Sequence, residues 1–258
     1  MESQHMSFPI SSFRTAVSTF LFILLGVIIV FATSCDKPDQ EYEEAIMCYK
    51  NQAYDEAVVL FAKAASRGHT KSQFSLGECY RLGKGVASNI NFAIVWYRRA
   101  ADQGYDEAET LLGDCYFYSL NNVTEAIYWW TKGAEHGNAV AQYRLGYYFG
   151  DIANEFKTAL IWLLKSAEQN NSDAENALGT LYFMGYGVDM DFIEAVKWYR
   201  KGAEHGNVNA QVNLGSCYEY GKGVQLDKSE AIKWYLLASD QGNLWAQEAL
   251  RRLGYSPL

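Results

Sequence analysis

The stretch LGECYRLGKGV, from Leu76 to Val86, returns almost unchanged as LGSCYEYGKGV from Leu214 to Val224. A Leu-Gly pair recurs at five regularly spaced positions, and a sixth leucine continues the series without its glycine. The intervals between these leucines are 36, 33, 33, 36 and 36 residues: Leu76, Leu112, Leu145, Leu178, Leu214 and Leu250. A period of this length is typical of repeat proteins in which each unit is a pair of helices.

The glycine-rich element differs between long and short intervals. The three longer intervals contain GKGV, GYGV and GKGV, and the two shorter ones lack it. A phosphate-binding Walker loop has four residues between its first glycine and its Gly-Lys pair, followed by Ser or Thr. Here five residues separate Gly77 from Gly83, and Lys84 is followed by glycine. We therefore expect an optional extension of a helix-to-helix turn, and no nucleotide or other cofactor.

The second half of each interval has a helical pattern. Alanine, two large residues and two small residues recur at offsets 0, 3, 4, 7 and 8, as in Ala93, Trp96, Tyr97, Ala100 and Ala101. These offsets place all five side chains on one helical face. A residue type that accepts the left-handed conformation follows at a fixed distance and predicts the helix end: Gly104, Gly137, Asn170, Gly206 and Gly242. Each pair has few large side chains, so the pairs are expected to be stable only when stacked.

Taken together, the pattern Ala-x3-Leu-Gly-x2-Tyr, Gly-x-Gly-Val and Ala-x2-Trp-Tyr-x2-Ala-Ala-x2-Gly resembles the Sel-1-like repeat family, a branch of the tetratricopeptide superfamily. The resemblance implies an all-α fold, a right-handed α/α superhelical solenoid over residues 43–258, and a scaffold or adaptor role without catalysis. The expected parts are a tetratricopeptide-like unit at 43–70, five Sel-1-like repeats at 71–107, 108–138, 139–172, 173–207 and 208–243, and a capping helix at 244–254.

The N-terminus has the pattern of an export signal. After Arg14, the apolar run TAVSTFLFILLGVIIVFATS ends immediately before Cys35. The segment resembles the lipobox of bacterial lipoproteins, with Ala32 where the family usually has leucine. We expect residues 1–34 to be a signal peptide or membrane anchor, Cys35 to carry lipid, and 36–42 to be a linker. The protein would then be extracytoplasmic, as a periplasmic or cell-surface lipoprotein; a single-pass transmembrane anchor is the alternative.

Charge and reactive residues narrow the choice of ligands. The formal net charge is −8, and an acidic surface repels nucleic acid, which is not an expected partner. Cys48, Cys79, Cys115 and Cys217 share one face of the first helices, which favours buried thiols over disulfides or metal ligands. Two histidines, His136 and His205, each precede a helix-ending glycine, a position that suits a positive charge.

The resemblance also implies a binding surface, because first helices line the concave face of tetratricopeptide-like proteins. Aromatic residues predominate at the positions expected to face this groove. They suggest binding of a peptide or partner protein; the alternative is that several of them pack against the neighbouring repeat. The expected groove residues are Phe74, Arg81, Phe117, Tyr118, Tyr143, Tyr147, Asn176, Phe183, Glu219 and Tyr220.

Two other functions are alternatives to a membrane-tethered, non-catalytic scaffold. One is a hydrolase of cell-wall or β-lactam substrates. Its Ser-x-x-Lys motif occurs once, from Ser34 to Lys37, where signal cleavage would destroy it, and Ser-Asp-Asn and Lys-Thr-Gly are absent. The other is glycan binding by groove aromatics, since flat rings suit sugar faces.

Overall fold

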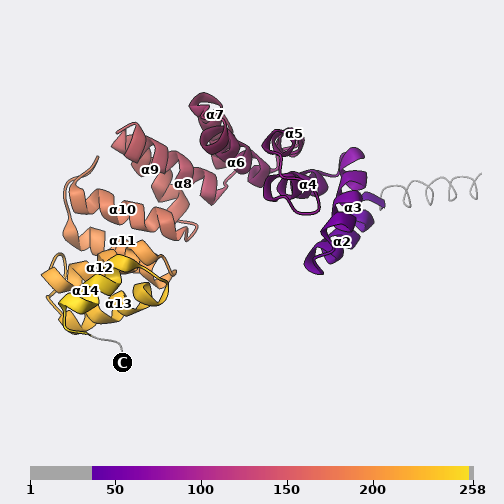
Figure 1. Cartoon of the computed structure of the whole chain (residues 1–258). Helices are drawn as coiled ribbons and strands as arrows, with labels where there is room; N and C mark the ends of the chain where they lie inside the picture. Colours follow the sequence, from indigo (N-terminus) through magenta and orange to yellow (C-terminus); the bar gives the residue numbers. More distant parts are fainter. Residues whose placement is uncertain (1–36, 256–258) are drawn as a thin grey trace, which may run out of the picture. The chain divides into compact units, whose positions relative to one another are not determined.

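The computed structural model describes residues 37–255, and every regular element in this range is helical (Figure 1). These residues form two compact units, 37–100 and 101–255. None of their helices has the length and apolar character needed to cross a bilayer. The expected signal or anchor at 1–34 and the lipid site Cys35 lie outside the described residues.

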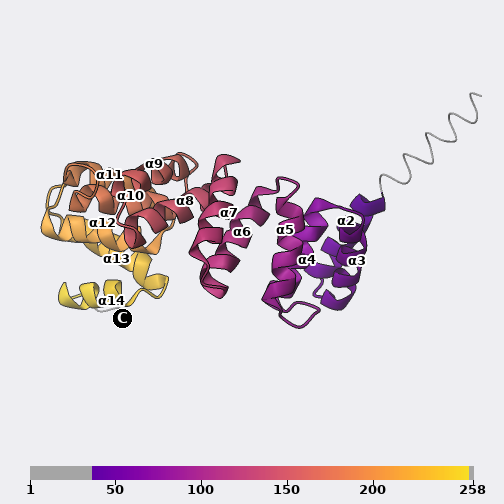
Figure 2. The ribbon, with the colours of Figure 1, turned by 90° about the horizontal axis from the view of Figure 1, so that it is seen from above.

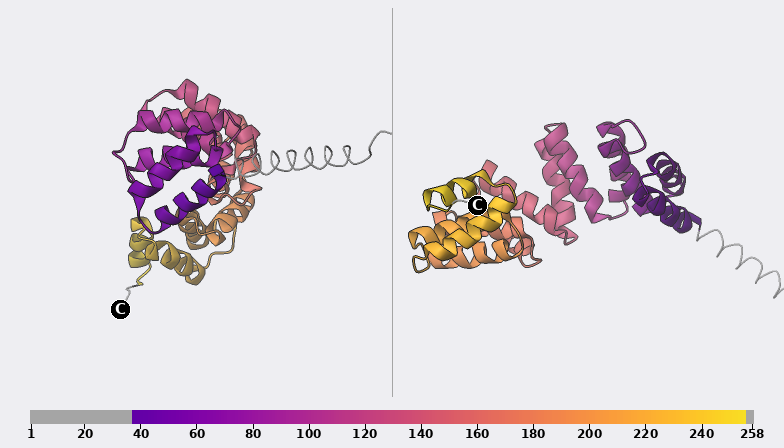
Figure 3. Two further views of the ribbon diagram at one scale, coloured as in Figure 1. Left: turned by 90° about the vertical axis from the view of Figure 1, so that its right-hand side faces the viewer. Right: turned by 60° about the horizontal axis from the view of Figure 1, so that its bottom comes forward.

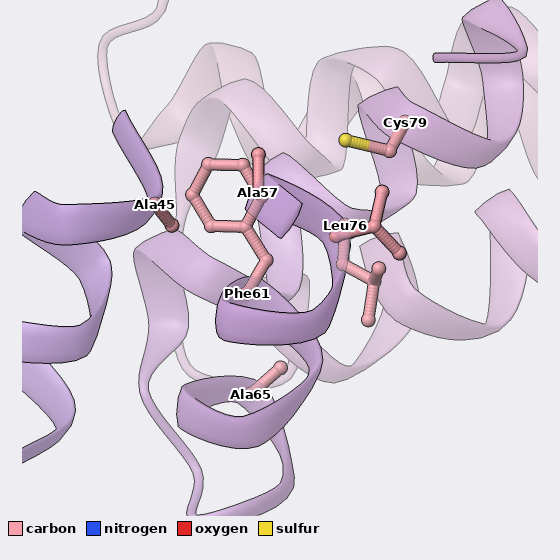
Figure 4. Close-up of a cluster of buried hydrophobic side chains, with 7 residues drawn as sticks. Ala45, Ala57, Phe61, Ala65, Leu76 and Cys79 are labelled. Carbon is pink, nitrogen blue, oxygen red and sulfur yellow. The ribbon is translucent and has the colours of Figure 1, made fainter. Parts of the chain in front are cut away.

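The first unit contains two helix pairs, α2 (Lys37–Lys50) with α3 (Tyr54–Ser66), and α4 (Thr70–Leu82) with α5 (Ile90–Ala101). Its core surrounds Phe61 of α3, which lies among Ala45 of α2 and Leu76 and Cys79 of α4 (Figure 4). Small residues beside one large ring let the three helices approach closely.

The expected linker at 36–42 is wrong over residues 37–42, which form the start of α2. The expected linker is therefore not a flexible tether in this range. The carboxylate of Glu41 is buried and lies 2.8 Å from Lys63 Nζ and 2.7 Å from Arg67 Nη1, both of α3 or its C-terminal cap. These ion pairs hold the first turns of α2 against its partner helix.

The second unit contains four helix pairs and a last single helix. Each helix of this unit packs on the next helix along the chain (Figure 2). The last two helices, α13 and α14, also contact each other and lie at the yellow end of the colour scale in Figure 3. The first helix α10 also contacts the first helices α8 and α12 across repeat boundaries. The elements are α6 (Asp106–Asp114), η1 (Cys115–Ser119), α7 (Val123–Glu135), α8 (Ala139–Tyr147), η2 (Tyr148–Ile152), α9 (Phe156–Ala167), α10 (Ser172–Met184), α11 (Phe192–Glu204), α12 (Val208–Tyr220), α13 (Lys228–Asp240) and α14 (Leu244–Arg252). The all-α solenoid of stacked helix pairs expected from the sequence is confirmed.

In five of the helix pairs, the Leu-Gly pair of the first helix lies against a large side chain of the second helix. Its leucine is buried, and its glycine leaves room for a large side chain of the second helix. A Cβ on Gly77 would lie 2.6 Å from the ring of Tyr97, closer than packed atoms allow. The same contact recurs in four more pairs: Gly113 with Trp130, Gly146 with Leu163, Gly179 with Tyr199, and Gly215 with Tyr235.

The Gly-rich element is a turn, as expected. Gly83 has φ +69° and ends α4, and the backbone N–H groups of Gly83 and Lys84 both donate to the carbonyl of Cys79. These N–H groups therefore close the helix end and do not point toward an anion. In the two short intervals, the first helix ends without a Gly-rich element. There the π-helical turns η1 and η2 are followed by Asn121 and Asn154, which have left-handed φ angles of +50° and +57°.

Candidate interaction surface

The second unit contains a solvent-open hollow of about 370 Å³ between α8 and α10. We call it the α8–α10 hollow. Side chains and backbone from α8, η2, α9, α10, the turn after α10, and α12 line it: Tyr143, Gly146, Tyr147, Gly150, Asp151, Asn154, Phe156, Leu163, Asp173, Asn176, Ala177, Thr180, Leu181, Tyr186 and Asn209.

The hollow exists because two side chains are smaller here than in the other pairs. In the pair before it, Trp130 covers the first-helix glycine and donates to Asp114 Oδ1 at 3.0 Å. Leu163 takes the place of that tryptophan, and it is shorter and carries no polar group. Gly150 stands where the neighbouring repeats have Phe117 and Phe183. A Cβ on Gly150 would meet only Ala159, at 3.4 Å, so the space above it is open.

Two pairs of aromatic rings form the walls of the hollow. The rings of Tyr143 and Tyr147 lie 6.4 Å apart at an interplanar angle of 38°. The rings of Phe156 and Tyr186 are stacked, with centroids 4.6 Å apart and an angle of 19°. Tyr147 is 37% exposed and Tyr186 is 45% exposed, so both pairs present ring surface to solvent.

Two aspartates give the hollow a negative charge, and no lysine, arginine or histidine of the described chain lines it. Partial burial raises the pKa of Asp151, whose carboxylate has no hydrogen-bond or ion-pair partner among residues 37–255. Asp173 accepts a hydrogen bond from Asn207 Nδ2 at 2.7 Å. Burial, and next the charge of Asp173, raise the pKa of Tyr143 to about 12, so this phenol stays neutral at physiological pH.

Three of the ten expected groove residues meet around this hollow: Tyr143, Tyr147 and Asn176. Asn176 is held by a hydrogen bond from Asn213 Nδ2 to its Oδ1, at 2.9 Å. Two more, Tyr118 and Tyr220, are exposed at the ends of other first helices and lie outside the hollow.

The remaining five expected groove residues make internal contacts. Three aromatic side chains pack on large neighbours: Phe74 on Tyr97, Phe117 on Trp130, and Phe183 on Phe192 and Tyr199. Two charged ones are paired: Arg81 with Glu78, and Glu219 with Arg252. Four of these five residues make their contacts within a single repeat, so these are not the packing against the neighbouring repeat that was the alternative for the groove positions; only Glu219 pairs with a residue beyond its own repeat, in α14. That the groove contacts a partner stays a prediction.

The hollow also includes residues that sequence reasoning missed, above all Asp151, Phe156, Asp173 and Tyr186. They come from three helices and a turn, and no motif joins them. A signal was present in the repeat alignment, because Leu163 and Gly150 are the small members of two columns that otherwise hold large side chains.

Three of the four cysteines expected to be buried are buried, and both histidines lie at helix C-termini as expected. Cys79, Cys115 and Cys217 are buried and Cys48 is half-buried, all as free thiols. Burial raises the pKa of the Cys79 and Cys217 thiols to about 11, so neither is a reactive thiolate at neutral pH. His136 and His205 are the residues that follow the last turns of α7 and α11. No cluster suited to a metal ion occurs between residues 37 and 255.

Comparison with known proteins gives a consistent result. The model of the Sel1 repeat matches six segments, 40–69, 70–105, 106–138, 139–171, 172–207 and 208–243. The first of them covers the unit expected to be tetratricopeptide-like. No curated protein matches the chain.

Solved structures with Sel1 repeats are similar over most of the chain. A protective antigen of uropathogenic Escherichia coli is 34% identical with a TM-score of 0.78, covering 84% of this chain and 49% of its own. The chain thus spans about half the length of that antigen. A Sel1 repeat protein from Oxalobacter formigenes is 32% identical with a TM-score of 0.73, covering 81% and 86%. An immunity protein from Pseudomonas aeruginosa, 22% identical with a TM-score of 0.54 and covering 86% and 88%, shares the fold.

Proposed function

Because the chain belongs to the Sel1 repeat family, we propose that it is a non-catalytic scaffold whose first helices in the second unit bind a protein or peptide. Repeat scaffolds of this kind present a continuous surface formed by successive repeats, and binding there needs no reactive group. Function belongs to the site and not to the fold, so the proposal depends on the surface itself.

The observation that carries the proposal is the α8–α10 hollow with its exposed rings. Tyr147 and Tyr186 present large apolar area and a polar hydroxyl at the mouth of a concave site. Tyrosines in such positions are frequent anchors of protein interfaces, because they bury much surface with little loss of side-chain freedom. The exposed Tyr118 and Tyr220 extend this aromatic character to the first helices on either side.

We further propose that the scaffold is tethered to a membrane on its extracytoplasmic side. The support is the sequence of residues 1–35, with its apolar run before Cys35. Metabolic labelling with an alkynyl fatty acid tests the tether. The full chain should take up label and the Cys35→Ala variant should not. Equal labelling of both would exclude Cys35 as the lipid site, and a membrane-bound but unlabelled chain would favour the transmembrane anchor.

Site-specific photo-crosslinking in cells tests the binding surface. A photoreactive phenylalanine replaces Tyr147 or Tyr220 on first helices; matched controls replace Ile161 of α9 or Leu237 of α13, which are exposed on second helices. We expect one defined protein adduct from the first-helix positions and none from the controls. Adducts of equal yield from Ile161 and Leu237, or none from Tyr147, would contradict the proposal.

A further inference from the structure

We propose that the α8–α10 hollow receives a positively charged side chain, lysine or arginine, from the bound partner. This inference rests on the proposed function and adds the chemistry of the contact. The volume of about 370 Å³ is at the lower end of ligand pockets, which suits one long side chain with its flanking backbone.

The rings of the hollow are arranged for a cation. Lysine and arginine bind over the faces of aromatic rings, and four such rings line this site: Tyr143, Tyr147, Phe156 and Tyr186. The chain uses the same interaction at two equivalent turns, where Lys84 Nζ lies 4.7 Å from the ring centroid of Tyr54 and Lys222 Nζ lies 5.1 Å from that of Phe192.

At the turn beside the hollow, the corresponding residue is Tyr186, which stacks on Phe156. The repeat that forms the hollow therefore contributes an additional ring where the other two turns contribute a lysine. As a result, the site has aromatic faces and no cation of its own.

The carboxylates favour a cation over other occupants. The side chains of Asp151 and Asp173 are both exposed. Asp151 has no hydrogen-bond or ion-pair partner among residues 37–255, and Asp173 accepts a hydrogen bond from the neutral amide of Asn207. Both carboxylates would attract a bound ammonium or guanidinium group, whereas they would repel a phosphate or carboxylate. A neutral sugar could stack on the rings but would gain no attraction from the two carboxylates.

The test uses the full chain in detergent micelles with trifluoromethylphenylalanine in place of Ile152, an exposed residue next to Asp151 that does not line the hollow, as a ¹⁹F NMR reporter. The probes are acetyl-Gly-Lys-Gly-amide, its arginine counterpart, its norleucine counterpart, which keeps the stem and lacks the ammonium group, and the neutral sugar chitotriose. We expect saturable shifts with lysine and arginine and none with norleucine. Asp151→Asn should weaken lysine binding about tenfold, while Asp240→Asn, an exposed aspartate at the end of α13, should not change it.

Three results would overturn the inference: equal shifts with norleucine, undiminished lysine binding by Asp151→Asn, or a response to chitotriose and not to lysine. If the lysine probe fails while photo-crosslinking at position 147 still captures a partner, the cation contact is wrong and the binding surface stands. If crosslinking fails as well, the proposed function falls with it.

Discussion

His205 places its Nδ1 2.7 Å from a carboxylate oxygen of Glu175, whose side chain is 1% exposed. The preceding long-range pair of this kind, His136 with Glu109, has the same separation. In the repeats between and after them, both members change together to glutamine: Gln169 donates to Gln142, and Gln241 donates to Gln211, each at 2.9 Å. The structure thus uses two interchangeable ways to join the start of the first helix to the end of the second.

This exchange predicts a rescue. His205→Gln alone leaves the buried carboxylate of Glu175 without its histidine and should lower the free energy of unfolding by about 1–3 kcal/mol. Adding Glu175→Gln recreates the pair seen in the neighbouring repeats and should recover most of that loss. Urea unfolding followed by circular dichroism measures both. A double variant no more stable than His205→Gln would show that the two positions are not coupled.

Two buried glycines are predicted to respond to alanine in opposite directions. A Cβ on Gly113 meets the ring of Trp130, so Gly113→Ala should destabilise by about 1–3 kcal/mol through overpacking. A Cβ on Gly150 meets only Ala159 at ordinary contact distance, so Gly150→Ala should stabilise by about 0.5–1 kcal/mol. Thermal unfolding of the two variants provides the comparison. A loss of stability in Gly150→Ala would contradict the open space above this residue.

The Glu219–Arg252 ion pair predicts a pH dependence of stability. Burial alone would raise the pKa of Glu219, but hydrogen bonds from Arg252 and Tyr235 outweigh it and hold the pKa below the usual 4.5. A carboxyl with a lowered folded-state pKa contributes stability above its unfolded pKa, and this contribution is lost as pH falls through the folded pKa.

Arg252→Gln should therefore destabilise by about 1–2 kcal/mol at pH 7, a range that allows for the half-exposed guanidinium. The difference in the free energy of unfolding between this variant and the parent chain should shrink as pH falls below 4.5, the usual glutamate pKa. The matched control is Arg251→Gln, because Arg251 pairs with the exposed Glu248 and should change stability by no more than about 0.5 kcal/mol. Equal effects of the two variants in urea titrations at several pH values would refute this account.

Cysteine reactivity should follow burial. Cys48 is half-buried, whereas Cys79, Cys115 and Cys217 are buried. Brief treatment of the native protein with iodoacetamide near pH 8, followed by peptide mass spectrometry, should modify Cys48 and leave the other three intact until denaturant is added. Rapid native modification of Cys79 or Cys217 would show that their helices do not pack as described.

The sequence was sufficient for the fold because each structural requirement recurs at the same phase. Leu76 and its equivalents fill the core, and the glycine after each leucine accepts a side chain from the second helix. The groove was less predictable. Helical periodicity tells which face Glu219 occupies, but not that Arg252, 33 residues further on, neutralises it. The start of α2 was not predicted for the same reason. The residues before Glu41 resemble a polar linker in sequence, and only the structure shows that Lys63 and Arg67 pair with Glu41.

The hollow depends on large side chains that one repeat lacks and the other repeats have. Tyr143, Tyr147 and Asn176 were expected from their place on the first helices. The space between them follows from the absence of a ring at Leu163 and of any side chain at Gly150. A motif search finds residues that are present, and so it does not detect a site created by two small ones.

Filling the hollow tests the central claim most directly. Gly150→Phe copies the residue that the preceding repeat has at the equivalent position, Phe117, within a π-helical turn of the same kind. With the photoreactive residue at position 147, the filled chain should keep its helicity and thermal unfolding but lose at least about nine-tenths of the partner adduct, a tenfold change. Undiminished adduct from a folded Gly150→Phe chain would show that the partner does not use the hollow.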